Sequence, residues 1–406
     1  MGAARHIALL SIAELLAMSL WFSATAVLPS LEQQWELTAS GAAWLTASVQ
    51  LGFVAGALGA AFFNLPDLLP PRRLIAVSAA LGALANLALA WWVSSLGPAL
   101  ALRFATGACL AGVYPPGMKV AAGHVTGARR GLAIGALVGA LSLGSATPHL
   151  IAGLAGPADL SPPEVLTVSS VLAIIGALLV LVAVRDGPHG AAPVPFDPAQ
   201  LGRVLRDPAV RLANLGYCGH MWELYALWSW LAVFLTAAAH TPDLTAARLL
   251  TFAAIGGAGL VGATFGGLLA DRVGRVTVTI AAMAISGTCC LVSPWAYDAP
   301  WALLVAFGLV WGASALADSA QFSAAVTELV EPSYLGTALT LQTCLGFALT
   351  MLPIWLLPLL AAQTGWQLAF VALAPGPLLG CVAMARLRRR PEAARLRAHT
   401  GSRQRR

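Results

Sequence analysis

Long apolar runs separated by short polar breaks fill this chain. A run of about 20 apolar residues can cross the hydrocarbon layer of a bilayer as a helix. By that rule the sequence predicts about twelve spanning helices. They cover residues 7–29, 40–63, 74–95, 98–122, 132–154, 164–184, 211–237, 247–270, 276–294, 300–323, 334–360 and 367–387. The pattern is typical of an all-α integral membrane protein.

Composition agrees with a membrane environment. Apolar residues make up 59% of the 406 residues and charged residues only 10%, whereas soluble domains are about 45–50% apolar and about 25% charged. The first apolar run is long and holds Glu14, so we interpret it as a retained first span and not as a removable signal. The six cysteines all fall within predicted spans without metal-ligand spacing, which predicts free thiols and no metal site.

One polar segment, "RDGPHGAAPVPFDPAQLGRVLRDPAVR", divides the chain. The two sides resemble each other, because "LWFSATAVL" from Leu20 recurs as "LWSWLAVFL" from Leu227, and Gly107 corresponds to Gly312. A duplication of this kind predicts two pseudo-symmetric six-helix halves with a site between them. We expect a first half, a cytoplasmic linker, a second half and a basic cytoplasmic tail, at 1–184, 185–210, 211–387 and 388–406.

Basic residues cluster in the loops on one side of the predicted membrane. The opposite loops hold mainly acids, with Arg248 as the exception, and this asymmetry places both termini in the cytoplasm. The net charge of +6 owes much to the tail from Arg386 to Arg406, a typical anchor near anionic lipid. We therefore expect a multi-pass protein of the plasma membrane, as in a bacterial inner membrane, that contacts lipids and binds no nucleic acid.

A few charged side chains lie inside the predicted spans. Each is a candidate functional residue, because a charge at mid-membrane costs at least about 2.5–3.5 kcal/mol. These residues are Glu14, Arg103, His220, Glu223 and Asp318. His220 and Glu223 are three residues apart and share a helix face, so they form either a proton relay or a hydrogen-bonded tie to a neighbouring helix. Arg103 could attract an anion, pair with a carboxylate or tie two helices together.

Aromatic and amide side chains also interrupt the spans. Trp21, Tyr225 and Trp228 are candidates to line a central cavity, since aromatic rings offer apolar area together with a polar tip. Packing against other helices or lipid is the alternative. Gln50 and Gln342 could hydrogen-bond a ligand, or could hold helices together.

Three short motifs resemble those of the major facilitator superfamily. "GGLLADRVGRV" is similar to the signature loop of that family and contains Gly267, Asp271, Arg272, Gly274 and Arg275. The resemblance implies that the glycine allows close helix contact and that the Asp–Arg set latches the cytoplasmic ends of the halves. The first-half loop "FFNLPDLLPPRRL" lacks the glycines but keeps Asp67, Arg72 and Arg73. "LRFATGACLAG" resembles the second motif of the family and places Arg103 and Gly107 on one face.

This resemblance implies a secondary active transporter that moves a small solute by alternating access. We expect coupling to protons through Glu14, the Glu223–His220 pair and Asp318, and export of an amphipathic or cationic compound. Proton-coupled uptake of a small organic or inorganic anion is the alternative, and a non-transporting receptor or scaffold is a second one. No P-loop or Ser–His–acid set is evident, so we expect a protein that is not an enzyme and needs no cofactor. We also expect a monomer.

Overall fold

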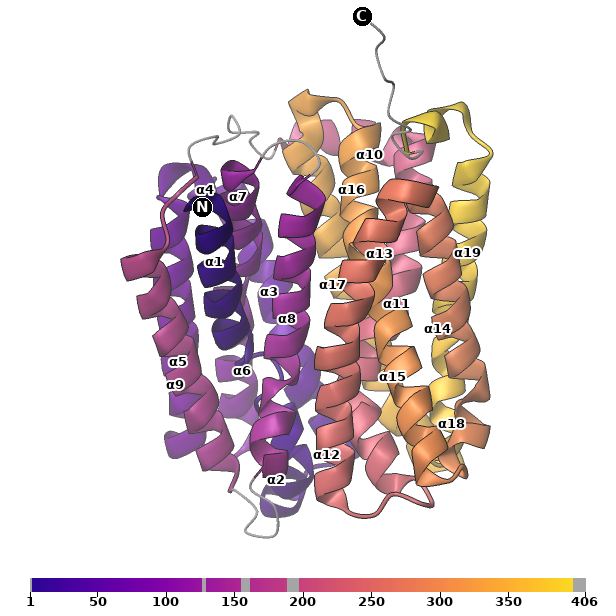
Figure 1. Cartoon of the computed structure of the whole chain (residues 1–406). Helices are drawn as coiled ribbons and strands as arrows, with labels where there is room; N and C mark the ends of the chain where they lie inside the picture. Colours follow the sequence, from indigo (N-terminus) through magenta and orange to yellow (C-terminus); the bar gives the residue numbers. More distant parts are fainter. Residues whose placement is uncertain (1, 126–128, 155–160, 188–196, 397–406) are drawn as a thin grey trace, which may run out of the picture.

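The computed structural model describes residues 2–125, 129–154, 161–187 and 197–396. Every regular element within these ranges is a helix, as the apolar runs predict. The helices form two bundles that stand side by side (Figure 1). The bundles correspond to the two predicted halves.

The N-terminal half begins with α1 and ends with α9. Its elements are α1 (Gly2–Met18), η1 (Thr25–Val27), α2 (Leu28–Trp35), α3 (Ala39–Phe62), α4 (Leu65–Leu68), α5 (Pro71–Trp92), α6 (Leu96–Leu110), α7 (Tyr114–His124), α8 (Arg129–Leu154) and α9 (Pro162–Ala183). The described part of the linker then holds η3 (Pro198–Gln200) and α10 (Leu201–Arg206).

The C-terminal half begins with the long helix α11. Its elements are α11 (Pro208–Ala237), α12 (Leu244–Phe252), η4 (Ala253–Ala258), α13 (Gly259–Val273), α14 (Arg275–Tyr297), α15 (Trp301–Ala317), α16 (Ser319–Leu329), η5 (Pro332–Tyr334), α17 (Leu335–Thr364), α18 (Trp366–Ala369), η6 (Phe370–Leu373), α19 (Pro375–Arg388) and η7 (Pro391–Leu396).

Ten helical segments in the described chain are long and apolar enough to cross a membrane. Two further helices, α1 and α11, stand in the same bundles and occupy the predicted first and seventh spans. Together they account for the twelve predicted spans. The beginning of α1 and the end of α19 lie on one face of the molecule, here called the terminal face, at the top of Figure 1.

Several predicted spans are not continuous α-helices, which corrects the sequence prediction. The fourth span of each half is interrupted, between α6 and α7 in the first half and at Asp318 in the second. In the first half, Pro115 lies in the first turn of α7. Proline has no main-chain N–H, so it is tolerated in the first turn of a helix but interrupts the hydrogen bonds of a helix interior. Its position therefore suits a new helix that begins at this point. The first span breaks after Met18, and the eighth contains the π-helical turns of η4. A hydropathy pattern registers none of these breaks, because the apolar run continues through them.

Close contacts through glycine repeat at equivalent positions in the two halves. A side chain at Gly107 would collide with the carbonyl of Val49, and one at Gly312 would collide with that of Ala254. These positions correspond at an offset of 205 residues. Small residues allow helix backbones to approach closely in a membrane, so the glycines that reveal the duplication in sequence also set the same helix packing in both halves.

The halves meet along two pairs of helices. Helix α3 packs against α17, and α8 packs against α12, η4 and α13. Near the face opposite the terminal face, Trp355 Nε1 donates to Ser40 Oγ over 3.3 Å and Arg248 Nη1 donates to the carbonyl of Ala152 over 3.3 Å. At mid-height Ser142 Oγ donates to the carbonyl of Ile255 at 2.6 Å. These three hydrogen bonds hold the halves together at the middle and at the far face.

Candidate functional site

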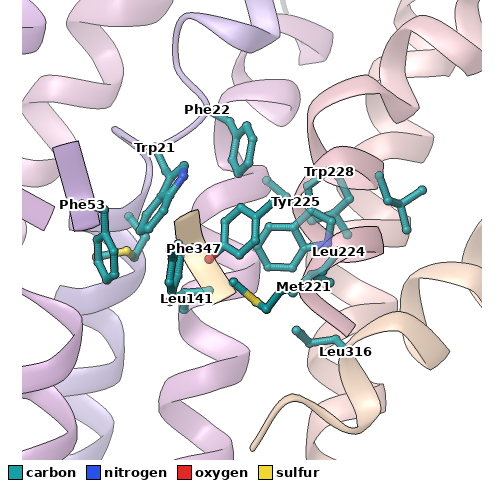
Figure 2. Close-up of a cluster of buried hydrophobic side chains, with 14 of the residues drawn as sticks. Trp21, Phe22, Phe53, Leu141, Met221, Leu224, Tyr225, Trp228, Leu316 and Phe347 are labelled. Atoms are coloured by element: carbon teal, nitrogen blue, oxygen red, sulfur yellow. The ribbon is translucent and has the colours of Figure 1, made fainter. Parts of the chain in front are cut away.

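Six aromatic side chains from both halves meet at the centre of the molecule. This central aromatic cluster consists of Trp21, Phe22, Phe53, Tyr225, Trp228 and Phe347 (Figure 2). Each is at most 5% exposed. The ring centroids of Phe53 and Phe347 are 4.3 Å apart, and those of Trp21 and Tyr225 are 5.5 Å apart, within the usual range of aromatic pairs. The rings therefore form a continuous contact across the boundary between the halves.

The structure brings the three predicted aromatic residues together and adds three others. Trp21, Tyr225 and Trp228 contact each other or share a ring neighbour. Phe22, Phe53 and Phe347 are not among the predicted residues, because a phenylalanine in a span gives no sign of whether it faces lipid or protein. The rings fill the space between the halves, so a solute can occupy the cluster only after they move apart.

Two side chains beside the cluster carry polar atoms without partners. Gln50 lies one turn before Phe53 on α3, and neither its Oε1 nor its Nε2 has a hydrogen-bond partner in the described structure. The same holds for Trp21 Nε1. All three atoms are buried, where an unsatisfied polar group is costly. They are available to hydrogen-bond a ligand at the cluster.

Arg103 supports the break in the first span. Its Nη1 donates to the carbonyl of Leu20 at 3.0 Å and to Ser23 Oγ at 3.4 Å, and its Nη2 donates to the carbonyl of Trp21. These carbonyls lie in the turns that follow α1, where a continuous helix would have used them. Arg103 makes no ion pair with a described carboxylate and is fully buried. Of the three predicted roles, this geometry favours the tie between helices.

A neutral polar network extends from the same break. Ser23 Oγ lies 2.8 Å from Asn86 Oδ1, and Asn86 Nδ2 donates to the carbonyl of Leu166 and to Ser170 Oγ, both at 3.0 Å. Asn86 is fully buried on α5. Asn86 is not among the predicted site residues, although an asparagine in an apolar span is itself a usable signal. The network joins the turns after α1 to α5 and α9.

Glu14 is buried on α1 without a hydrogen-bond partner. Neither carboxylate oxygen has one in the described structure, and the side chain is 2% exposed. Its Oε2 lies next to Gly117 of α7, where an added Cβ would be 3.3 Å away. An isolated carboxylate in such a place is far more easily buried as the neutral acid. Glu14 is thus suited to hold a proton.

Glu223 has a different surrounding from Glu14. Three donors from α14 and α15 surround its carboxylate: Trp311 Nε1 at 2.6 Å, Ser286 Oγ at 2.8 Å and Cys290 Sγ at 3.4 Å. Together they give both carboxylate oxygens a partner, unlike those of Glu14. The donors were not foreseen, because they become neighbours only through tertiary packing.

His220 contacts Asp318 and not Glu223. His220 Nδ1 lies 2.9 Å from Asp318 Oδ1, without the alignment of a hydrogen bond. His220 Nε2 has no partner in the described chain. His220 and Glu223 share a face of α11 as predicted. The carboxylate that lies next to the His220 ring is nevertheless that of Asp318, at the break between α15 and α16. This pairing replaces the predicted His220–Glu223 pair.

Gln342 forms a tie within the second half. Its Nε2 donates to Asn214 Oδ1 at 3.0 Å, which joins α17 to α11, while its Oε1 lacks a described partner. No group of three or more His, Cys, Asp or Glu residues suitable for a metal ion occurs in the described ranges.

The signature loop is built around Arg275 on the terminal face. Arg275 Nη2 lies 2.7 Å from Glu328 Oε1, and its Nη1 donates to Gln321 Oε1 at 2.8 Å. These contacts join α14 to α16 within one half. Asp271 and Arg272 are exposed at the end of α13 and make no contact between the halves with the side chains that the structure describes.

Two glycines of the loop have different roles. Gly274 has a φ of 91°, which suits glycine at the end of α13. Gly267 was expected to allow close helix contact, but an added Cβ there would meet nothing within 4 Å. The close contact belongs to Gly266, which faces the carbonyl of Ala317, because neighbouring positions on a helix point in different directions.

In the corresponding loop of the first half, Arg72 contacts the linker. The main-chain N–H of Arg72 donates to Asp186 Oδ1 at 3.2 Å, and its Nε lies 3.7 Å from Asp186 Oδ2. Arg73 is exposed. The side chain of Asp67 lies outside the described residues.

Comparison with known proteins agrees with this architecture. The Major Facilitator Superfamily profile matches residues 10–264 and, again, 213–405. No curated protein matches the sequence significantly.

Similar solved structures cover nearly the whole chain. A D-xylose–proton symporter has a TM-score of 0.76 at 14% identity, covering 97% of this chain and 99% of the other. The xylose transporter XylE from E. coli, in a partially occluded inward-open conformation, gives 0.72 at 13%, covering 95% and 99%. A bacterial homologue of the human lysosomal transporter Spinster gives 0.72 at 14%, covering 94% and 96%. With two profile matches across its length and this twelve-span arrangement, the chain belongs to the major facilitator superfamily.

Proposed function

We propose that this protein is a secondary active transporter that exports an amphipathic or cationic compound by alternating access, in exchange for protons. The observation that carries the proposal is the central aromatic cluster. Each half contributes three of its six rings. Movement of one half against the other separates these rings and opens a site with aromatic walls. Aromatic faces attract organic cations and offer apolar area to amphipathic molecules.

Buried carboxylates supply the coupling in this proposal. Glu14 lies on α1, seven residues before Trp21 of the cluster, and Glu223 lies on α11, two residues before Tyr225. Glu223 is therefore on the helix that carries Tyr225 and Trp228, and Glu14 is on the helix that leads into the turns carrying Trp21. Proton binding at Glu14, Glu223 or the His220–Asp318 pair would change the charge of a helix that contacts the solute. The fold similarity to a D-xylose–proton symporter supports proton coupling as a general mode for this architecture.

Uptake of an anion through Arg103 has less support. An anion-binding arginine presents its terminal donors as a pair, whereas both terminal nitrogens of Arg103 already donate to the first span and only its Nε is without a described partner. The basic ends of the helices on the terminal face favour a cytoplasmic location for that face, and a bacterial inner membrane suits this arrangement. The protein would act as a monomer.

Transport by purified protein in liposomes tests the proposal. The probe is tetraphenylphosphonium, with the vesicle interior made acidic so that outward proton flow drives accumulation of the cation. We expect accumulation by the wild type, and a loss of about tenfold in apparent affinity for Trp228→Ala, since a desolvated cation–π contact is worth roughly 1–2 kcal/mol. Trp295→Ala is the matched control, because Trp295 is 73% exposed.

The same vesicles distinguish the alternatives. If the vesicles move benzoate and none of the phosphonium ion, the protein transports anions and the proposed export of cations is wrong. Movement of xylose alone would assign a sugar substrate. A folded protein that moves none of the three probes would favour a receptor or scaffold.

A further inference from the structure

A pocket opens beside α10 on the terminal face of the second half. It has a volume of about 190 Å³ and is lined by residues of α10, α11 and α17: Val204, Leu205, Arg211, Asn214, Leu215, Cys218 and Leu345. It is separate from the central aromatic cluster. Its lining is apolar apart from one arginine and one asparagine.

The pocket extends from the membrane surface into the hydrocarbon depth. Arg211 lies in the first turn of α11, and Cys218 is seven residues further along, about 10 Å at 1.5 Å per residue. Leu345 lies ten residues after the start of α17, about 15 Å along its axis. Leu205, Leu215 and Leu345 are 48%, 54% and 40% exposed. The pocket is therefore open sideways, toward lipid, through leucine side chains.

Positive charge lies at the surface end of the pocket, where Arg211 is part of the lining and Arg206 ends α10 directly after the lining residue Leu205. Arg206 and Arg211 are exposed and make no ion pair with a described residue. The nearest acid in sequence, Asp207, accepts the main-chain N–H groups of Ala209 and Val210 as the N-cap of α11. Its carboxylate is thus engaged with the helix, and the two guanidinium groups remain available to an anion.

The shape and charge of the pocket fit one class of ligand. We propose that it binds an anionic phospholipid, with the phosphate at Arg206 and Arg211 and an acyl chain along Leu215, Cys218 and Leu345. Arginine suits phosphate because its planar donors match the phosphate oxygens. The leucine-lined opening at acyl-chain depth favours a lipid over a free phosphate ion, which would gain nothing from that part of the pocket. The bound lipid would hold the linker helix α10 against the second half.

Binding to delipidated protein in detergent tests this proposal. Native mass spectrometry measures the retention of phosphatidylglycerol and of phosphatidylcholine over a titration. We expect a preference for phosphatidylglycerol that Arg206→Gln with Arg211→Gln weakens about 25-fold, since each surface arginine is worth about fivefold. Leu345→Trp, which fills the acyl end, should weaken phosphatidylglycerol binding without any change in charge.

The control is the double variant Arg386→Gln with Arg389→Gln. These arginines are exposed at the end of α19 on the same face, and their removal changes the charge equally. Thermal unfolding without lipid checks that every variant is folded. Equal loss of binding in this control, equal retention of both lipids, or stabilisation by inorganic phosphate alone with the same dependence on Arg206 and Arg211 would each overturn the proposal.

Discussion

Arg103→Met tests the physical reason for the break in the first span. Methionine keeps an unbranched apolar stem like that of arginine, is shorter, and removes every donor. The carbonyl of Trp21 then loses its described side-chain partner, while the carbonyl of Leu20 keeps the Ser23 hydroxyl at 3.0 Å. An orphaned buried acceptor costs about 1–3 kcal/mol, and the loss of one of two hydrogen bonds at Leu20 costs about 0.5–1.5 kcal/mol.

Loss of the arginine also removes a buried charge, which offsets part of this cost. We therefore expect Arg103→Met to lower the free energy of unfolding by about 2 kcal/mol. Arg103→Lys keeps the charge, but its single ammonium group is a point donor, without the planar fork that spans two carbonyls, and should cause an intermediate loss. Arg272→Met, at an exposed position, should change stability by no more than about 0.5 kcal/mol.

Equilibrium unfolding in mixed detergent micelles measures these differences. A loss below about 0.5 kcal/mol for Arg103→Met would refute the assignment of Arg103 to the two carbonyls. Full stability of Arg103→Lys would show that charge matters here and that the two-carbonyl geometry does not.

Three further predictions concern coupling and packing. Glu223→Gln and Asp318→Asn should each abolish the proton flux that tetraphenylphosphonium drives in liposomes. Glu331→Gln, an exposed control, should leave this flux intact. Normal flux in both buried variants would show that these carboxylates do not carry the protons. Gly312→Ala should destabilise the protein by about 1–3 kcal/mol because its Cβ meets the carbonyl of Ala254, whereas Gly267→Ala, in open space, should be tolerated; equal effects would contradict the packing argument. In a double-mutant cycle, Arg275→Gln and Glu328→Gln should show a coupling energy of about 1 kcal/mol. Hydrogen exchange in α16 should rise in each single variant. Strictly additive effects on the free energy of unfolding would mean that this ion pair does not stabilise the contact between α14 and α16.

The number of spans and the duplication could be predicted because both depend on local sequence. Apolar runs of sufficient length are visible in any window, and Gly107 and Gly312 keep their order and spacing. The positions of buried charge could also be predicted, since Glu14, Arg103 and Glu223 are exceptional in apolar spans. All three are buried in the structure.

The partners of these residues could not be predicted. His220 has a carboxylate three residues away in sequence, yet it contacts Asp318, which is 98 residues further along. That contact depends on how α15 ends and α16 begins, and a break inside an apolar run leaves no hydropathy signal. The same limit explains Gly266 and Gly267, where one helical position, a rotation of about 100°, separates close packing from open space.

The two halves carry the same Leu-Trp pair on helices of different mechanical character. Trp228 lies within the unbroken helix α11, so its indole changes direction only through its own side-chain torsions. Trp21 lies in the turns after α1, where turn hydrogen bonds from the N–H groups of Leu20 and Trp21, together with Arg103, hold the main chain in place of a helical ladder. A rotation of the main chain at Trp21 would need only these few bonds to break and would carry the whole ring with it, whereas Trp228 cannot turn with its main chain unless α11 unwinds. The aromatic wall of the first half is thus held by a few replaceable hydrogen bonds, and that of the second half by a continuous helix.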